Sequence, residues 1–255
     1  MTSAPFEGVG VALVTLFAAD GSLDSRATAA HAASLVEAGV RAVVVSGSTG
    51  EAPALDLDER ARLVQEVRHE LPTEVPVIAG TGDVTTARAE AHTRAAVEAG
   101  ADAVMALTPL RVTDPRPYYE AVRRAAGSLP VLGYHFPAMS PPGIALDVLE
   151  DLDIDGLKDS SGDAERLLIE AERFTGALYT GAAPLLIHAR AVGCAGAILA
   201  LANLEPQRCV AAFGGDVTAQ RELLSGHLAA KADFPHGLKQ ALHEKFGTST
   251  VARMG

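Results

Sequence analysis

Short apolar runs alternate with longer segments of helical periodicity, and this alternation limits the fold more than any other feature of the chain. Each run has the length of one buried strand, and each helical segment is long enough to return the chain to the start of the next strand. Eight such units at a spacing of roughly thirty residues predict a (β/α)8 TIM barrel. An open doubly wound sheet is the alternative, which the lack of a nucleotide-binding fingerprint disfavours. The runs are residues 9–14, 42–46, 75–79, 103–107, 131–134, 154–158, 177–180 and 196–200.

Helical periodicity is clearest in four segments between these runs. Their apolar residues recur every three or four positions, as one buried face of a helix requires. Asp56 followed by Glu59 is typical of a capping box, which puts the start of the second helix at residue 57. The four segments are residues 25–38, 57–71, 86–99 and 164–174.

The last fifty residues differ from the rest, because after about Glu205 the pattern becomes purely helical. The helical segments are residues 219–230 and 236–245. We therefore expect a catalytic barrel over residues 1–204. Residues 205–255 would hold the last barrel helix and a short C-terminal helical extension.

Composition and charge exclude several classes of protein. The 255 residues are 48% hydrophobic and carry a formal net charge of -11, so the chain can bury one large core and does not suit a nucleic-acid partner. No signal peptide or membrane-spanning run is apparent, and Cys194 and Cys209 are too few for a disulfide framework. The histidines lack the spacing of a zinc site. These features predict a cytoplasmic protein without a metal ion.

Two of the strand-like runs end on side chains that can carry out chemistry. Tyr134 ends the fifth run and Lys158 ends the sixth. Parallel α/β folds place reactive groups at the carboxyl ends of strands, where a lysine in apolar surroundings can attack a carbonyl group. A tyrosine hydroxyl nearby can then carry the proton. Each residue alone also fits a plainer role, as a solvated lysine or a packed aromatic. Tyr118 and Tyr119 fall in a helical stretch, and we expect them to pack.

A turn of small residues follows the second run, with the sequence Ser46-Gly47-Ser48-Thr49-Gly50-Glu51. Gly47 and Gly50 let the backbone bend tightly, so that several N–H groups would point into one concavity suited to a carboxylate. The hydroxyls of Ser48 and Thr49 would add donors. A plain turn before the next helix fits these residues equally well. Gly80-Thr81-Gly82, after the third run, lacks the last glycine of a dinucleotide fingerprint and is expected to be a close-packed turn.

The order of these features resembles the dihydrodipicolinate synthase / N-acetylneuraminate lyase family. Members of that family are (β/α)8 barrels with a helical C-terminal extension, commonly tetramers built as pairs of dimers. They work through a lysine Schiff base with pyruvate or a related 2-oxo acid. The resemblance spans nearly the whole barrel, over residues 8–17, 47–51, 80–82, 108–109, 134–137, 156–159 and 196–203.

At the matching positions the resemblance implies a role for each candidate residue. Lys158 would form the imine, and Tyr134 would shuttle protons. Ser48 and Thr49 would hold the carboxylate of the 2-oxo acid and orient the tyrosine. A protonated imine is an electron sink, so C3 deprotonation or C3–C4 cleavage gives a stabilised enamine without a metal or organic cofactor. The other residues expected at the substrate are Thr15, Gly47, Gly50 and Ile198.

Three departures from the family pattern bear on the second substrate and on assembly. The synthases carry a tyrosine pair where this chain has Leu110 and Arg111, and the second of those tyrosines joins a proton relay in a neighbouring subunit. They also carry an arginine, absent from residues 138–142 here, that holds the carboxylate of the aldehyde. Their helical tail is longer. The resemblance therefore implies an aldehyde other than aspartate semialdehyde, and a homo-oligomer that is a dimer or a tetramer.

The function expected from these residues is that of a Schiff-base lyase or aldolase, which cleaves or condenses a pyruvate-type 2-oxo acid with an aldehyde. Three alternatives remain open. The chain would be dihydrodipicolinate synthase itself, a 2-oxo acid dehydratase that uses the same imine, or a catalytically weak family member that binds a 2-oxo acid.

Overall fold

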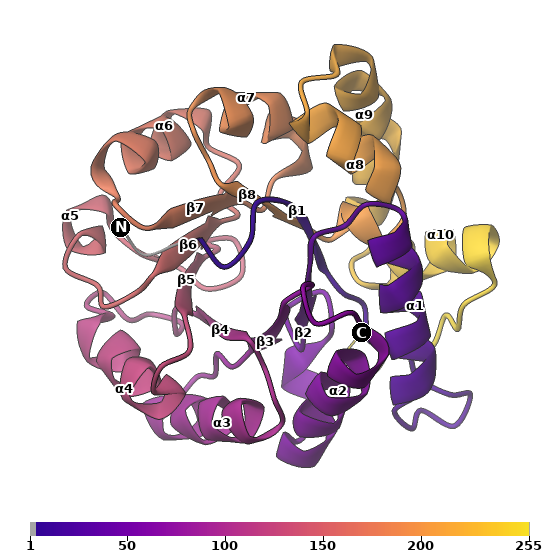
Figure 1. The fold of residues 1–255 in the computed structure, drawn as a ribbon, viewed down its shortest axis with the longest axis horizontal. Helices are drawn as coiled ribbons and strands as arrows, with labels where there is room; N and C mark the ends of the chain where they lie inside the picture. The colour runs from indigo at the N-terminus through magenta and orange to yellow at the C-terminus, as the bar shows by residue number, and fades with distance from the viewer. Residues whose placement is uncertain (1–3, 255) are drawn as a thin grey trace.

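Eight parallel strands close into a barrel in the computed structural model, which describes residues 4–254. Each strand pairs with the next one in sequence and β8 pairs with β1, so the order of strands around the barrel equals their order in the chain (Figure 1). This arrangement confirms the predicted (β/α)8 TIM barrel. The strands are β1 (Gly8–Ala12), β2 (Ala42–Val45), β3 (Val77–Gly80), β4 (Ala103–Leu107), β5 (Val131–His135), β6 (Gly156–Asp159), β7 (Ala177–Thr180) and β8 (Gly196–Leu199).

The predicted strands all exist, and the differences lie at their ends. The sequence predicts a first strand that runs to residue 14, but β1 ends at Ala12. The N–H of Leu13 still donates to the Val44 carbonyl oxygen of β2 at 2.9 Å, but the N–H of Val14 donates to the side-chain oxygen of Asn203 at 3.1 Å instead of to a strand. The third and sixth strands each begin two residues later than predicted, at Val77 and Gly156, and each extends one residue further.

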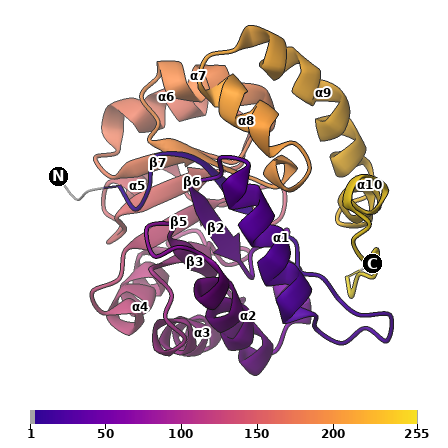
Figure 2. The same cartoon turned by 45° about the vertical axis from the view of Figure 1, so that its right-hand side comes forward.

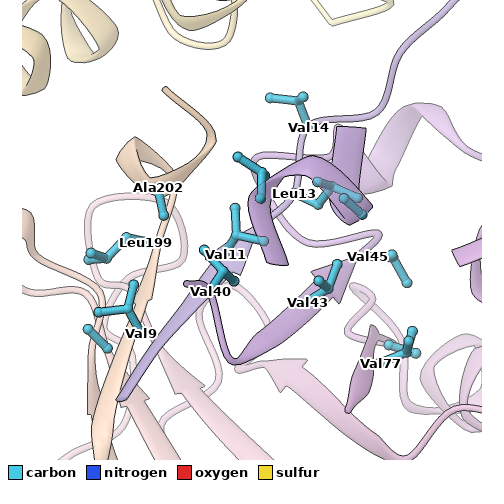
Figure 3. Close-up of a cluster of buried hydrophobic side chains, with 14 of the residues drawn as sticks. Val9, Val11, Leu13, Val14, Val40, Val43, Val45, Val77, Leu199 and Ala202 are labelled. Carbon is cyan, nitrogen blue, oxygen red and sulfur yellow. The ribbon is translucent and has the colours of Figure 1, made fainter. Parts of the chain in front are cut away.

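Side chains along the strands alternate between two buried apolar layers, the pattern of a sheet that is covered on both faces. The outer layer lies between the strands and the helices and includes Val9, Val11 and Val43 (Figure 3). The inner layer fills the barrel. Its members include Ala12, Val44, Ile78, Met105, Leu132 and Ile198.

The N-terminal segment closes the barrel at the end where the strands begin. Phe6, just before β1, stacks on Tyr179 of β7 with a centroid distance of 4.6 Å, and the Tyr179 hydroxyl donates to the carbonyl oxygen of Phe6 at 2.8 Å. Both side chains belong to the inner layer. A ligand therefore has to enter from the opposite end, where the strands finish.

Helices surround the barrel as the alternation predicts, and α2 begins with the expected capping box between Asp56 and Glu59. The helix after β5 is the exception, with only four residues. The helices of the barrel are α1 (Ser25–Glu37), α2 (Leu57–Glu70), α3 (Thr86–Glu98), α4 (Arg116–Ala126), α5 (Leu146–Leu149), α6 (Ala164–Arg173), α7 (Leu186–Ala191) and α8 (Pro206–Phe213).

Two further helices, α9 (Val217–Ala232) and α10 (His236–Phe246), form the predicted C-terminal extension outside this ring (Figure 2). The chain then returns to the barrel, where the guanidinium of Arg253 pairs with Glu59 of α2 at 2.7 Å. Within residues 4–254, no helix combines the length and the apolar character needed to cross a membrane.

Strands β2 and β3 approach each other very closely where they end. A Cβ on Gly80 would overlap the carbonyl group of Ser46 and lie 2.9 Å from the nitrogen of Gly47. A Cβ on Gly82 would lie 2.5 Å from the backbone nitrogen of Leu107. The turn Gly80-Thr81-Gly82 is therefore close-packed, as predicted, and its first residue packs against the backbone of Ser46 and Gly47 in the segment that follows β2.

Replacing Gly80 with alanine should lower the free energy of unfolding by about 1–3 kcal/mol, because the methyl group forces two strands apart. Gly226→Ala is the matched control. It lies inside α9, where a Cβ would make ordinary contacts with Leu201 at 3.4 Å and Glu205 at 3.9 Å, so alanine should stabilise the protein by about 0.5–1 kcal/mol. Urea unfolding followed by circular dichroism measures both, and effects of the same sign would contradict the close approach of the strands.

Candidate active site

Tyr134 and Lys158 lie side by side inside the barrel. They are register partners on β5 and β6, and the Lys158 Nζ sits 4.2 Å from the centroid of the Tyr134 ring. Each residue is only 4% exposed. Among residues 4–254, the side chain of Lys158 makes no ion pair and no hydrogen bond. The structure thus brings the two predicted reactive side chains together and leaves the amine free to react.

The turn after β2 is held by hydrogen bonds within its own backbone. The N–H of Gly50 donates to the Gly47 carbonyl at 3.1 Å, and the N–H of Glu51 donates to the Ser48 carbonyl at 3.2 Å. The N–H groups of Ser48 and Thr49 have no partner within the described chain, and neither do their hydroxyls. Two N–H groups and two hydroxyls of adjacent residues thus remain for a ligand. A nest in which every N–H group was free would offer more N–H donors than this turn does.

Thr15 and Gly50 attach this turn to the end of β1. The buried Thr15 hydroxyl donates to the Gly50 carbonyl oxygen at 2.7 Å. A Cβ on Gly50 would lie 3.0 Å from the carbonyl oxygen of Leu13, so this position needs glycine. At Gly47 a Cβ would meet nothing closer than Val44 at 3.7 Å. Close approach therefore explains one of the two predicted glycines, and Thr15 supports the turn from behind.

Ile198 of β8 belongs to the same inner layer as Tyr134, as expected for a residue that lines the pocket. Ser48 is half-buried and Thr49 is buried. Within the described residues, no hydrogen bond joins either of them to Tyr134, so their expected role in orienting the tyrosine stays a prediction.

Gly181, directly after β7, is a neighbour of Lys158 that sequence reasoning missed. A Cβ there would overlap the hydroxyl of Ser160 and lie 3.1 Å from the Cε of Lys158. A larger residue here would force the side chains of Ser160 and Lys158 to move from their present positions. The signal in the sequence was a glycine that immediately follows a strand, as in the turns after β2 and β3.

Tyr119 of α4 does more than pack. Its buried hydroxyl donates to the Ala106 carbonyl oxygen at 3.0 Å, lies 2.9 Å from the hydroxyl of Thr108, and accepts from the N–H of Tyr134 at 3.3 Å. Burial raises the pKa of Tyr119 to about 12, which keeps the hydroxyl protonated. Tyr119 therefore fixes the backbone that carries Tyr134, from the outer side of the barrel.

The segment that replaces the synthase tyrosine pair lies at the mouth of the barrel. Leu110 is 49% exposed, and Arg111 adopts a left-handed backbone with a φ of 63°. The N–H of Arg111 donates to the Pro141 carbonyl oxygen at 2.8 Å, which joins this segment to the loop after β5. Tyr134 therefore has no second tyrosine from its own chain beside its hydroxyl within the described residues.

A model of the dihydrodipicolinate synthetase family matches residues 5–246. The chain belongs to this family. An uncharacterized DapA-like lyase of Halobacterium salinarum is 38% identical over 84% of this chain and 73% of its own length. The 4-hydroxy-tetrahydrodipicolinate synthase of Thioalkalivibrio sulfidiphilus is 34% identical over 94% of this chain and 87% of its own length.

A solved structure extends the comparison to the fold. A prophage protein of Escherichia coli K12, which belongs to the dihydrodipicolinic acid synthase family and was solved in complex with pyruvate, superposes with a TM-score of 0.88. It is 26% identical, and the match covers 97% of this chain and 91% of that one. Members of the family are lyases, so this chain is an enzyme of that class, and the resemblance drawn from the sequence is confirmed.

Behind Lys158, a buried charged cluster anchors β6 in this member of the family. The Asp159 side chain accepts from the Ser161 N–H at 2.6 Å and pairs with Arg166 at 3.1 Å, and Arg166 pairs with Glu170 at 2.7 Å. Burial, and then the neighbouring Asp159 carboxylate, raise the pKa of Glu170 to about 8. A pKa of about 8 leaves Glu170 mostly protonated at neutral pH, although Arg166 is nearby.

Tyr119→Phe should lower the free energy of unfolding by about 1–3 kcal/mol, because it leaves buried groups on β4 and β5 without their hydrogen-bond partner. Tyr118→Phe is the control. The Tyr118 hydroxyl makes longer bonds, to Leu107 at 3.2 Å and from Asp83 at 3.4 Å, so its loss should cost less than about 1 kcal/mol. Denaturant unfolding compares them, and equal losses would show that the Tyr119 hydroxyl has no special role.

Glu170→Gln should change how stability depends on pH. A carboxyl group whose pKa is raised by folding stabilises the protein at low pH, and this contribution is lost as pH rises from about 4.5 to about 8. The variant does not titrate there, so relative to the wild type it should gain on the order of 2–4 kcal/mol between pH 5 and pH 9.

Thermal unfolding across this pH range measures the effect. Glu165→Gln, an exposed position on the same helix, is the control and should follow the wild type. Parallel curves for all three proteins would mean that Glu170 is ionised in the folded state.

Proposed function

We propose that this enzyme is a Schiff-base-forming lyase, a class I aldolase that cleaves or condenses a pyruvate-type 2-oxo acid with an aldehyde. The lysine that forms the imine is Lys158. Family membership supports pyruvate-dependent lyase chemistry in general, and the pyruvate complex of the related prophage protein supports the 2-oxo acid in particular.

One observation carries the assignment of the nucleophile. The amine of Lys158 has no ion-pair partner in the part of the chain that the structure describes, and it lies inside the barrel, 4.2 Å from the ring of Tyr134. Lys158 is also the only lysine before residue 231. An amine that donates to no carboxylate keeps its lone pair available once it has lost a proton. No other lysine of the barrel competes for this role.

The reaction follows from these groups. The Nζ of Lys158 attacks C2 of the 2-oxo acid, and loss of water from the adduct gives a protonated imine. Tyr134 gives its proton to the hydroxyl that leaves the adduct as water, so it is a phenolate in the imine complex. In the cleavage direction, the substrate hydroxyl at C4 loses its proton to this phenolate, the C3–C4 bond breaks, and the electron pair passes into the imine. This gives the aldehyde and an enamine. Protonation at C3 and hydrolysis by water then release the new 2-oxo acid and free Lys158.

The turn after β2 supplies the site for the carboxylate. The free N–H groups and hydroxyls of Ser48 and Thr49 donate to its oxygens, and Thr15, Gly47 and Gly50 shape the turn. Ile198 covers the methyl or methylene side from β8. These donors orient the 2-oxo acid before the imine forms, and they need no metal ion or organic cofactor to do so.

The second substrate differs from that of the synthases in this proposal. Leu110 and Arg111 stand in place of the relay tyrosines, and residues 138–142 hold no arginine for a second carboxylate. The synthase reaction is the runner-up, supported by the 34% identity to a named synthase over 94% of the chain. A dehydratase through the same imine and a weakly active binding protein have no specific observation in their favour. A homo-oligomer and a cytoplasmic location also stay predictions.

Incubation with pyruvate and borohydride should add one reduced pyruvate to the intact protein, and Lys158→Ala should abolish this adduct, because the imine needs that amine. Tyr134→Phe should still form the adduct but should slow turnover with an aldehyde by about 10²–10⁴-fold, the range of general acid–base catalysis. Mass spectrometry of the intact protein measures the adduct. An aldehyde screen that includes aspartate semialdehyde measures turnover and separates the two candidate reactions.

Lys231→Ala is the matched control, since Lys231 is exposed on α9, and it should form the adduct like the wild type. A wild-type protein that gives no adduct with pyruvate or other 2-oxo acids would contradict the proposal.

A further inference from the structure

Glu51, the last residue of the turn after β2, is a buried carboxylate that the reaction does not use. It is 0% exposed, and one of its oxygens pairs with the Nζ of Lys239 on α10, which is also 0% exposed. Its other oxygen accepts the backbone N–H groups of Arg253 and Met254, at 2.7 and 2.8 Å. Within the described residues, all three hydrogen-bond donors to this carboxylate therefore lie about two hundred residues further along the chain.

Further bonds hold that C-terminal segment against the barrel. The Nζ of Lys239 also donates to the carbonyl oxygen of Val251 at 2.7 Å and lies 4.5 Å from the ring centroid of Phe17. The guanidinium of Arg253 covers the same ring at 4.5 Å and donates to both oxygens of Glu59 at 2.7 Å. The segment is thus a fixed part of the structure beside the loop after β1.

The Glu51 backbone transmits this attachment to the turn. Its φ of 55° lies in the left-handed region, which a non-glycine residue keeps only where its surroundings hold it. Its N–H closes the turn on the Ser48 carbonyl at 3.2 Å, so any movement of Glu51 moves the residue that offers donors to the substrate.

We infer that Lys239 and the C-terminal segment 248–254 position the carboxylate-binding turn, with Glu51 as the link between them. This inference rests on the proposed function, because it assigns the turn to the 2-oxo acid. Lys239, Glu51 and the amides of Arg253 and Met254 are positioning residues and do not touch the substrate.

Charge gives a second reason for the pair. Glu51 lies two residues from Thr49, so an unneutralised carboxylate there would repel the carboxylate of the incoming 2-oxo acid. The Lys239 ammonium cancels this charge from behind the turn. Removing Lys239 alone would leave a buried uncompensated anion, whereas making both residues neutral would leave none.

Lys239→Met should raise the pyruvate concentration needed for half-maximal borohydride trapping about tenfold or more, with the plateau of trapped protein unchanged. Adding Glu51→Gln to that variant should return the pyruvate concentration for half-maximal trapping most of the way to the wild-type value. A general loss of packing at Lys239 would not be reversed by this second substitution. Lys245→Met is the matched control on the same helix and should behave as the wild type, since Lys245 is exposed and donates to the Leu204 carbonyl oxygen.

Hydrogen exchange of the turn, residues 46–52, is measured on the same proteins without any ligand, and it should be faster in Lys239→Met only. Met254→Pro removes one N–H donor to Glu51 and leaves Lys239 in place, so it tests the same link should Lys239→Met not fold. If the wild type traps no 2-oxo acid but Lys239→Met still exchanges faster than the wild type, the result would contradict the proposed function and leave the inference about the position of the turn intact. Wild-type exchange and wild-type half-saturation in the folded variants would overturn the inference.

Discussion

The register between β5 and β6 is the constraint on which the site depends. Because Tyr134 and Lys158 are partners across two parallel strands, both side chains point into the barrel at the same height. A slip of one residue in either strand would turn the side chain of that strand outward, toward the helices. The register is held from outside, by the Tyr119 hydroxyl on the Tyr134 backbone and by the charged cluster around Asp159. The chemistry faces inward, and the groups that fix its position lie on the outer face.

Two buried lysines have opposite surroundings in this molecule. Lys158 has no carboxylate partner within the described chain, whereas Lys239 contacts a buried glutamate and a carbonyl oxygen. The partners of Lys239 fix the position of its side chain and of the elements that it joins, whereas Lys158 lies beside Tyr134 with no such partner. The difference lies in the neighbours that the fold supplies.

Local pattern in the sequence was sufficient to predict the strands and the capping box at Asp56, because both depend on neighbours in the chain. It was also sufficient to bring Tyr134 and Lys158 together, because parallel strands of a barrel all end at the same mouth. The predicted positions of strand ends were less accurate where a distant side chain took the place of a backbone partner on the next strand. At Val14 that side chain is Asn203. The roles of Tyr119, Gly181 and Lys239 depend on contacts between separate elements. No local pattern distinguishes a tyrosine that packs from one whose hydroxyl holds a neighbouring strand.

The attachment of Glu51 to Arg253 and Met254 has a consequence for how the protein is made. The turn belongs to the second strand–helix unit, but the N–H groups of Arg253 and Met254 that bind Glu51 lie about two hundred residues later in the sequence. During synthesis from the N-terminus, the barrel strands emerge from the ribosome well before those residues do. In a nascent chain, Glu51 would therefore lack these two backbone donors until residues 253 and 254 have emerged, long after the strands on either side of the turn.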